Sequence, residues 1–520
     1  MNGSKAMKRV AGIILFSMLI SGLSAQVFRF GTPVSKSYSM QVTRGAEQNW
    51  CITKDKFGAV YFGNDDNLVI RYDGTRWSTI KLNPDNYTSV RALTTDENGI
   101  VYVSGVNEFG YIQPDSSGQR VYYSMASRLA DARDLTSSFT VVPEIDKLPG
   151  GIDRSIGELK SMITVGTKVY ALSPGALVIY DSGTDNLSFV DLRELGFRQF
   201  ERIFYIGGRI ILTNNRHGLY QLEEGKISLL PGGDFFGFKI TLILFPYSEN
   251  KIIVATLNQG IYLYDYSTGS INSSFIEKRA AEKLKDLYIY SGAMLHSGEM
   301  AFGTTSDGVY LFDRNGINTG HWTSDNIEMQ DNVITAMYAD HEENSEIWIS
   351  STGTVSSVYV NLPFTRFDEK SGLRGSVNSF CRFNGAVFVA TDQGLFRSGS
   401  DVNGNRTFSL FNDINSQIFP LHVAKFPTDS FLLAGSTFSG VYKIDSNNRS
   451  SMIPLISDPC RTVYQSRLNK NRFYFGLNSR VIRILDYRSG DWEIESTIWN
   501  IPGTVDRKST RLNSSHVSQS

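Results

Sequence analysis

The stretch that decides the fold is residues 90–103, which read VRALTTDENGIVYV. An alternating apolar run meets the turn Asp96-Glu97-Asn98-Gly99, and a second apolar run follows it. The glycine supplies the positive φ angle that a short hairpin loop needs, and the aspartate side chain caps the turn. A third strand is predicted from Gly110, and the turn at 115–118 (DSSG) leads into a fourth strand at 119–123. Four strands of about five residues with their turns need about 40 residues, the size of one β-propeller blade.

The same pattern recurs along the chain. Its second strand, a short apolar run after the turn, occurs ten times, at residues 60–63, 101–103, 169–171, 210–212, 252–254, 300–303, 347–349, 387–389, 432–435 and 473–476. The copies lie about 40 to 48 residues apart, except for one interval of about 68 between the second and the third. Apolar and polar residues alternate with period two in these runs, and the turns between them are rich in Gly, Asp and Asn. Both features disfavour helical repeats. Two short helical segments, 127–133 and 277–285, interrupt the pattern and are predicted to be surface additions.

The repeats predict an all-β fold with two domains. Residues 26–366 hold seven copies and are predicted to form a seven-bladed β-propeller. Residues 367–505 hold three more and are predicted to be the first blades of a second, incomplete β-propeller. A strand near Phe28 is expected to complete the last blade of the first propeller, because closure removes the free sheet edges.

Residues 1–25 have the pattern of a secretory signal peptide. A positively charged start precedes an apolar run from 10 to 23, and Ala25 stands at the cleavage position. The run of about 14 residues is shorter than the roughly 20 that span a bilayer. Export with cleavage before Gln26 is therefore predicted, and an uncleaved membrane anchor is the alternative.

The charges and cysteines exclude some classes of protein. The 51 Lys and Arg nearly cancel the 52 Asp and Glu, and the formal net charge is -1. Without a basic patch or charged block, the chain is not expected to bind nucleic acid. Cys51, Cys381 and Cys460 lie far apart, whereas an exported protein that relies on disulfides usually carries more cysteines, in even number. Each cysteine is predicted to be a small buried hydrophobe.

Several phrases resemble two-component regulator propeller proteins, most closely those that also carry a triple-tyrosine-motif domain. These phrases are GTPV (31–34), QNWCI (48–52), YDGTRW (72–77), NEFGY (107–111) and LPFTRF (362–367). The resemblance covers nearly all of residues 26–505.

The resemblance implies two seven-bladed propellers, a β-sandwich, one membrane helix and a cytoplasmic output module, which is a histidine kinase or a helix-turn-helix domain. Only three blade copies follow residue 367. The resemblance thus implies the periplasmic sensor region of a regulator that is anchored in the inner membrane when intact, here without its output half. Residues 506–520 lack strand alternation and are expected to be a non-native tail, with a genuine disordered tail as the alternative.

No catalytic or metal-binding constellation is predicted. Residues 435–440 (GSTFSG) lack the Gly-x-Ser-x-Gly elbow. The pair Asp65-Asp66 and the run 340–343 (DHEE) each suit a solvated turn better than a calcium or acid–base site. The histidines are scattered, with no pair at metal-ligand spacing; they are His217, His296, His321, His341, His422 and His516.

Glu108-Phe109 is the one candidate for ligand contact. The pair is predicted to lie between two strands of the second blade, where propellers present ligand-facing loops. An acidic and an aromatic side chain there could hydrogen-bond to a sugar and stack on it. A structural corner is the alternative.

Two classes of function remain open. In the first, the propellers recognise an extracytoplasmic ligand, such as a glycan, or a partner subunit, and a homodimer forms through the propellers. In the second, the chain is a secreted hydrolase or lyase whose acid and base come from loops without a linear motif. The missing motifs favour sensing, so no catalytic residue, cofactor or metal is expected here, although the intact regulator could carry a histidine kinase. Neither the ligand nor its binding residues follow from the sequence.

Overall fold

The computed structural model describes residues 33–82, 88–132, 140–141, 157–193, 199–339, 346–360, 362, 366–400, 406–426 and 429–502. The predictions for the signal peptide, for the run 340–343 and for the tail 506–520 lie outside these residues. The contacts between Cα atoms divide the chain into one unit of residues 33–364 and a second unit whose described part is 366–502.

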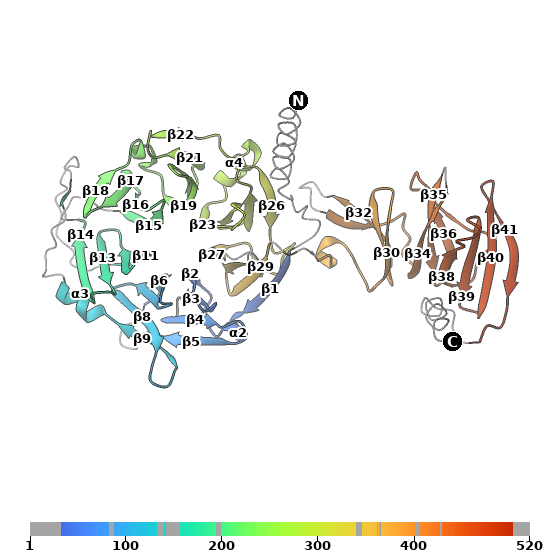
Figure 1. The fold of residues 1–520 in the computed structure, drawn as a ribbon, viewed down its shortest axis with the longest axis horizontal. Coiled ribbons are helices and arrows are strands. Elements are labelled where there is room, and N and C mark those ends of the chain that lie inside the picture. The colour runs from blue at the N-terminus through green and yellow to red at the C-terminus, as the bar shows by residue number, and fades with distance from the viewer. Residues whose placement is uncertain are drawn as a thin grey trace, which may run out of the picture. The chain divides into compact units, whose positions relative to one another are not determined.

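The described residues of the first unit form seven antiparallel sheets arranged in a ring, with the first strand of each sheet at the inner edge (Figure 1). Four sheets are β2(Asn49–Lys54) β3(Val60–Asn64) β4(Leu68–Tyr72) β5(Trp77–Lys81), β6(Val90–Thr95) β7(Val101–Gly105) β8(Glu108–Pro114) β9(Arg120–Ser124), β11(Ser161–Val165) β12(Lys168–Leu172) β13(Ala176–Asp181) β14(Asn186–Asp191), and β15(Phe200–Ile206) β16(Arg209–Asn214) β17(Gly218–Glu223) β18(Lys226–Leu229). The other three are β19(Thr241–Ser248) β20(Lys251–Thr256) β21(Ile261–Asp265) β22(Ser270–Asn272), β23(Ile289–Met294) β24(Met300–Thr304) β25(Val309–Phe312) β26(Asn318–Trp322), and β27(Ile334–Ala339) β28(Glu346–Ser351) β29(Thr354–Tyr359) β1(Val34–Ser39). The short strand β10 (Thr140–Val141) adds in parallel to β18.

The helices among the described residues are short and lie between sheets along the chain. α3 (Ala126–Ala132) and α4 (Lys278–Lys285) occupy the two segments in which the sequence predicts helices, so both predictions are confirmed. The remaining helical turns are α2 (Met40–Thr43), η1 (Gly233–Phe236) and η2 (Glu369–Ser371).

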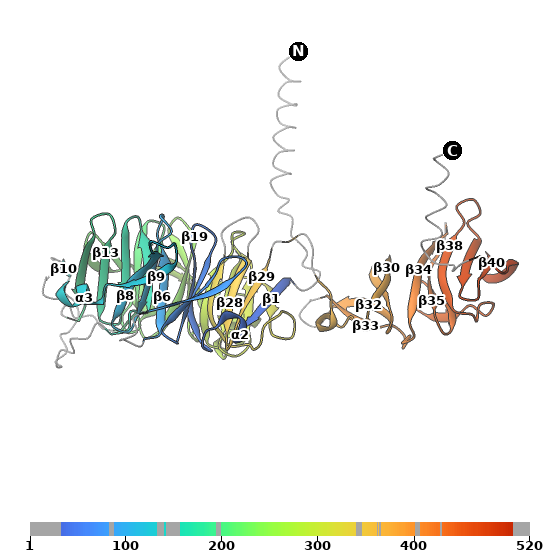
Figure 2. The same ribbon diagram turned by 90° about the horizontal axis from the view of Figure 1, so that it is seen from below.

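All ten predicted second strands are confirmed, because each copy of the apolar run lies in the second strand of a sheet, from β3 to β39 (Arg472–Leu477). Every residue of β3, β7 and β24 is buried, since neighbouring sheets cover both faces of a middle strand. The outermost strands are more exposed, as β5 shows. Figure 2 presents the ring from the side, where the strands run from one face to the other.

The predicted Asp-x-x-Gly turns hold the hairpins together. Asp96 Oδ1 accepts hydrogen bonds from the backbone N–H groups of Asn98 (3.0 Å) and Ile100 (2.9 Å). Gly99 has a φ of 82°, which a residue with a side chain rarely adopts. The second carboxylate oxygen of Asp96 accepts a hydrogen bond from the Tyr102 hydroxyl of the second strand at 3.4 Å. The turn is thereby tied to the core.

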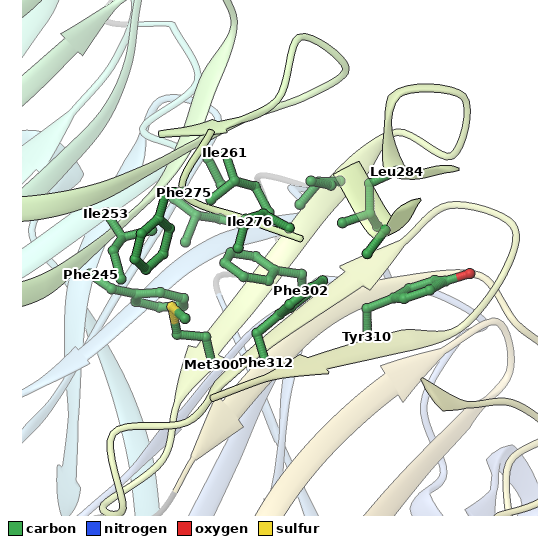
Figure 3. Close-up of a cluster of buried hydrophobic side chains, with 14 of the residues drawn as sticks. Phe245, Ile253, Ile261, Phe275, Ile276, Leu284, Met300, Phe302, Tyr310 and Phe312 are labelled. Atoms are coloured by element: carbon green, nitrogen blue, oxygen red, sulfur yellow. The ribbon is translucent and has the colours of Figure 1, made fainter. Parts of the chain in front are cut away.

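The core lies between neighbouring sheets. In Figure 3, Phe245 and Ile253 of one sheet face Met300, Phe302 and Phe312 of the next. All five side chains are buried. Burying a side chain of this size stabilises the fold by roughly 1.5–3 kcal/mol, so each sheet depends on its neighbour.

The last sheet of the first unit contains both ends of its chain. β1 pairs antiparallel with β29, from Val34↔Tyr359 to Ser39↔Thr354. Tyr38 of β1 stacks on Trp348 at 6.1 Å, and Trp348 meets Phe62 of the first sheet at 5.5 Å. The first and last sheets therefore share one core. The sequence places this strand near Phe28, which lies outside the described residues; the strand that pairs begins at Val34.

The second unit has three sheets among its described residues. They are β30(Val377–Phe383) β31(Ala386–Thr391) β32(Gly394–Ser400) β33(Arg406–Leu410), β34(Ile418–Lys425) β35(Ser430–Ser436) β36(Gly440–Ile444) β37(Ser450–Met452), and β38(Cys460–Gln465) β39 β40(Val481–Arg488) β41(Asp491–Ile498). One apolar cluster joins the first sheet to the second, and another joins the second to the third. Phe367 and Leu373 pack against the outer face of the first sheet, where Phe380 stays 74% exposed.

Candidate functional site

The first strands of six sheets in the first unit share an irregularity at their start. The register between first and second strand shifts there by one residue, which leaves one extra residue on the inner strand of the ring; these residues are Trp50, Arg91, Glu201, Leu242, Tyr290 and Thr335. Such a β-bulge re-aims a side chain and interrupts the pairing. The bulges recur at one end of the ring.

Side chains link these strand starts around the ring. The Thr335 hydroxyl of β27 donates to the Asn49 carbonyl of β2 at 2.7 Å. The Arg202 guanidinium of β15 donates to the carbonyl of Lys160, just before β11, at 2.7 Å. We call the end of the ring at which the first strands begin the strand-start face; its residues used below are Trp50, Asp65, Ser89, Arg91, Glu158, Lys160, Glu201, Asn215, Phe238, Ile240, Tyr288 and Tyr290.

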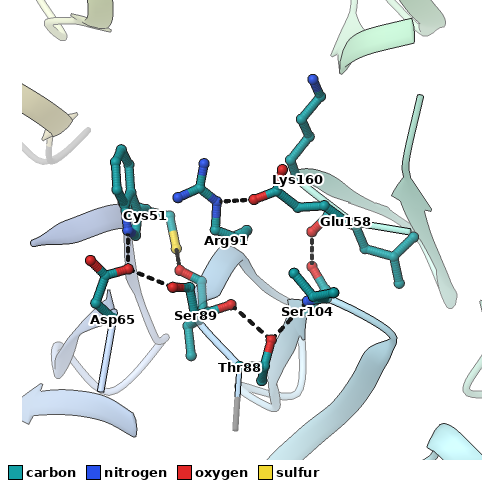
Figure 4. A network of polar contacts seen from close by, with 12 residues as sticks. Cys51, Asp65, Thr88, Ser89, Arg91, Ser104, Glu158 and Lys160 are labelled. Carbon is teal, nitrogen blue, oxygen red and sulfur yellow. Dashed lines mark hydrogen bonds and ion pairs between the residues drawn. The ribbon is translucent and has the colours of Figure 1, made fainter. Parts of the chain in front are cut away.

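One part of the strand-start face is aromatic and charged (Figure 4). The Arg91 guanidinium lies 4.0 Å from the ring centre of Trp50, and Arg91 Nε is 2.6 Å from Glu158 Oε1. The Trp50 indole N–H and the Ser89 hydroxyl both donate to Asp65 Oδ1, each at 2.5 Å. A cation–π contact contributes roughly 0.5–2 kcal/mol and fixes the planes of both groups. Trp50 and Arg91 therefore form a pre-oriented cation–aromatic platform.

The next two sheets continue the charged part. Lys160 and Glu201 form an ion pair at 2.5 Å, and both side chains are less than one fifth exposed. The Asn215 amide donates to the other oxygen of Glu201 at 2.5 Å. A partly buried ion pair of this kind holds its side chains in one geometry, although its net contribution to stability is small.

The following sheets are apolar at the same end of the ring. Phe238, Ile240 and Tyr288 stand just before β19 and β23 and are 77%, 41% and 48% exposed. Phe238 and Tyr288 have φ angles of 58° and 51°, in the left-handed region. For a bulky residue this conformation is rare and costs of order 1–2 kcal/mol. Backbone strain of this kind gathers at functional sites, and here it holds two aromatic rings in solvent.

Cys51 lies behind the charged part and is partly buried. Burial raises the pKa of its thiol to about 12, and a backbone hydrogen bond and the charges of Arg91 and Arg202 oppose this rise. Burial likewise raises the pKa of Cys381 to about 11 and that of Cys460 to about 12. All three cysteines are free thiols. A thiol with so high a pKa is protonated and unreactive at neutral pH.

Glu108 and Phe109, the sequence candidates, lie inside a sheet and not in an exposed loop. They begin strand β8 and are both fully buried. The Tyr122 hydroxyl donates to Glu108 Oε1 at 2.8 Å, and the Ser124 hydroxyl donates to it at 2.5 Å. The pair is a structural corner of its sheet because the turn before it is only two residues long, which draws both residues into the strand ladder.

The other motifs of the sequence have turn roles. Asp65 lies in the turn between β3 and β4, as predicted, but it also joins Trp50 and Ser89 on the strand-start face. Ser436 Oγ accepts the backbone N–H groups of Phe438 and Ser439, both at 3.1 Å, so it stabilises its own turn. Among the residues that the structure describes, no three His, Cys, Asp or Glu side chains are grouped as a metal site. His341 and His516 fall outside that part of the chain.

The sequence reasoning missed the bulge residues. A bulge places two residues opposite one, and no residue type is needed to make it. Glycine at the facing position of the second strand was a signal: Gly63, Gly105 and Gly303 each face a strand start so closely that a Cβ would lie 2.4–2.5 Å from an atom there. Within the described residues, no helix is long and apolar enough to cross a membrane.

No protein-family profile and no curated protein matches the chain. Among solved structures, the extracellular domain of BT3049, described as a hybrid two component system of B. thetaiotaomicron, matches with a TM-score of 0.59 at 15% identity, over 89% of this chain and 60% of that one. The extracellular domain of BT4673 from the same organism gives 0.45 at 15% identity, over 89% and 61% of the two chains. Virginiamycin B lyase from Staphylococcus aureus gives 0.45 at 12% identity, over 63% and 99%.

The chain therefore spans about 60% of the length of the first two structures. The likeness to the BT3049 domain is one of fold, and that fold matches the propeller sensor family that the sequence resembles.

Proposed function

We propose that residues 33–364 are a complete seven-bladed β-propeller that recognises an extracytoplasmic ligand at its strand-start face. The chain is then the periplasmic sensor region of a signal-transduction or transcription regulator, which is anchored in the inner membrane when intact. Residues 366–502 are, on this proposal, the first blades of a second propeller. The shared core of the first and last sheets and the fold likeness to the BT3049 domain support this reading.

The observation that carries the ligand site is the pairing of a cation–aromatic platform with strained, exposed aromatic rings. Arg91 lies over the Trp50 ring, while Phe238 and Tyr288 stand in solvent on left-handed backbone. Exposed aromatic side chains bind flat apolar surfaces, and fixed charged groups bind hydroxyl groups. A saccharide offers both surfaces, so we propose a glycan as the ligand.

Recognition fits this face better than hydrolysis. Glu158 and Glu201 are each in contact with a cation, Arg91 and Lys160. The two carboxylates are positioned to orient the cations, and we propose that this region is not an enzyme.

Binding of defined oligosaccharides tests the proposal. The chain should be titrated calorimetrically with hexasaccharides from cellulose, xylan and heparin. We expect one of them to bind, and Arg91→Ala and Phe238→Ala each to weaken that binding about tenfold or more, as the loss of one charged hydrogen bond or one buried ring contact predicts. Phe57→Ala is a matched control, because Phe57 is 69% exposed in the hairpin turn between β2 and β3. If no hexasaccharide binds, or if both variants bind as the parent does, the proposal is wrong.

A further inference from the structure

A cavity lies in the first unit at the end opposite to the strand-start face. It has a volume of about 430 Å³ and is lined by the sheets β11–β14 and β15–β18. Its residues stand at the start of β12, the end of β13, the start of β14 and the turn between β17 and β18. Ligand cavities in proteins typically measure about 300–1,000 Å³, so this one accommodates a small molecule.

The floor of the cavity is apolar and incompletely covered. Ile179 of β13 faces Ile210 and Leu222 of the neighbouring sheet. Leu222 is buried, whereas Ile179 and Ile210 are only partly buried, although they pack against the core between the two sheets. Neighbouring sheets of the ring diverge toward its outside, and here the side chains do not fill the gap.

The strand register brings an aromatic ring and several polar groups to one wall. Lys168, Asp181 and Asn186 are direct neighbours across β12, β13 and β14, and so are Tyr170, Ile179 and Ser188. Residues that face one another across antiparallel strands project to the same side of the sheet. The Tyr170 ring therefore shares one side of the sheet with an amide, a hydroxyl, an ammonium and a carboxylate.

These groups keep fixed hydrogen-bonding roles. Burial, together with the Asp181 charge, raises the pKa of Tyr170, so its hydroxyl stays protonated and can donate. A hydrogen bond from the Thr167 side chain holds the pKa of Asp181 below its usual range, so this carboxylate accepts. Asn186 is exposed, and its amide offers two donors and an acceptor.

We propose that this cavity is a binding site for a neutral saccharide of one or two rings. The apolar floor and the Tyr170 ring suit the C–H face of a sugar, and the rim supplies donors and acceptors for its hydroxyl groups. Lys168, Asp181 and Glu224 carry charges of both signs around the opening, which favours an uncharged ligand over an anion. The site is separate from the strand-start face, so this proposal does not depend on the function proposed above.

Saturation-transfer NMR on the full chain with cellobiose, xylobiose, maltose and mannobiose tests this site. We expect at least one disaccharide to bind, and Tyr170→Ala to weaken that binding about tenfold or more. Asn186→Ala should weaken it several-fold, since one hydrogen bond contributes about 0.5–1.5 kcal/mol. Tyr170→Phe keeps the ring and should retain most of the binding.

Two controls separate this site from the other one and from unfolding. Any disaccharide binding that Arg91→Ala removes belongs to the strand-start face, so the cavity is tested by the binding that Tyr170→Ala removes in the Arg91→Ala background. Tyr464→Ala removes a tyrosine that is 42% exposed in the second unit and should also have no effect. If Tyr170→Ala does not fold, Asn186→Ala and Ser188→Ala at the rim decide the outcome. The site is refuted if none of the four disaccharides binds, or if the bound one is unaffected by the folded cavity variants.

Discussion

Phe238 has a backbone conformation that few aromatic residues adopt, and its ring gains little from burial. Its φ is 58° and its side chain is 77% exposed. Glycine adopts this region without the clash of a Cβ atom, whereas another residue is strained by of order 1–2 kcal/mol. A ring that strains the backbone without filling the core is consistent with a role in recognition.

Phe238→Gly should therefore stabilise the protein while it weakens glycan binding. The gain in unfolding free energy should reach about 1 kcal/mol, because relief of the strain exceeds the extra entropy that glycine adds to the unfolded chain. Urea denaturation followed by tryptophan fluorescence measures it. Phe57→Gly is the matched control: Phe57 is similarly exposed but is not among the residues with positive φ, so glycine should give no gain there. A loss of stability in Phe238→Gly would contradict the strain argument.

At the residue scale, the sequence predicted the turn residues correctly but did not predict most residues of the candidate site. Asp96 and Gly99 follow from local chemistry alone, because a short hairpin needs a cap and a positive φ. For Glu108 the sequence left a ligand contact and a structural corner open, because its burial depends on Tyr122 and Ser124, which lie on the next strand. Trp50 and Arg91 meet only because two neighbouring sheets bulge at the same end, and no local pattern carries that information.

At the scale of elements, the strand β1 joins the ends of the first unit. Its six residues pair with β29, and Tyr38 enters a cluster of aromatic rings. The ring centre of Tyr38 lies 4.9 Å from that of Trp77 and 6.1 Å from that of Trp348. A side chain that neither of their hairpins contains thus packs between the first sheet and the last sheet.

Tyr38→Ala should destabilise the whole first unit. Tyr38 is 8% exposed, and truncation of a buried aromatic side chain costs about 3–5 kcal/mol. The thermal unfolding midpoint of the first unit should fall, as calorimetry on the full chain will show, whereas Tyr38→Phe should fall much less. Tyr464→Ala in the second unit leaves the first transition in place. An unchanged first transition in Tyr38→Ala would show that the two sheets hold together without this strand.

Strand positions were predictable because each sheet repeats the same alternation of apolar and polar residues and the same type of turn. All ten second strands and both helices follow from the sequence. The closing strand is the exception: it pairs with residues more than 300 positions away, and its own segment has no partner nearby in sequence. A segment of that kind is recognisable only from the ring that it completes.

At the scale of the whole molecule, the two units differ in how their sheets are supported. In the first unit, the shared core of the first and last sheets gives every sheet two neighbours. In the described part of the second unit, only the middle sheet packs against two others. Sheets that stack in a row are stabilised by their neighbours, so the outer ones open most easily.

Limited proteolysis of the full chain should degrade residues 366–502 before residues 33–364. The two outer sheets of the second unit have fewer packing neighbours, and they also expose large apolar side chains. Phe380 on the first sheet is 74% exposed, and Ile494 on the last sheet is 54% exposed. Trypsin digestion followed by mass spectrometry should show a lasting fragment that ends between Val360 and Gly372. A fragment that retains 366–502 for as long as the ring survives would contradict the expectation and would favour a homodimer through these sheets.

The pairing of β1 with β29 has a mechanical consequence. Val34 and Tyr359 face each other, so the chain enters and leaves the first unit at the same end of one ladder. Tension between these two points would act across the ladder and peel it apart one pair at a time, from Val34↔Tyr359 toward Ser39↔Thr354. A ladder pulled along its length would instead load its six pairs together. A small force on these two points should therefore separate β1 from β29, while the other six sheets bear no load.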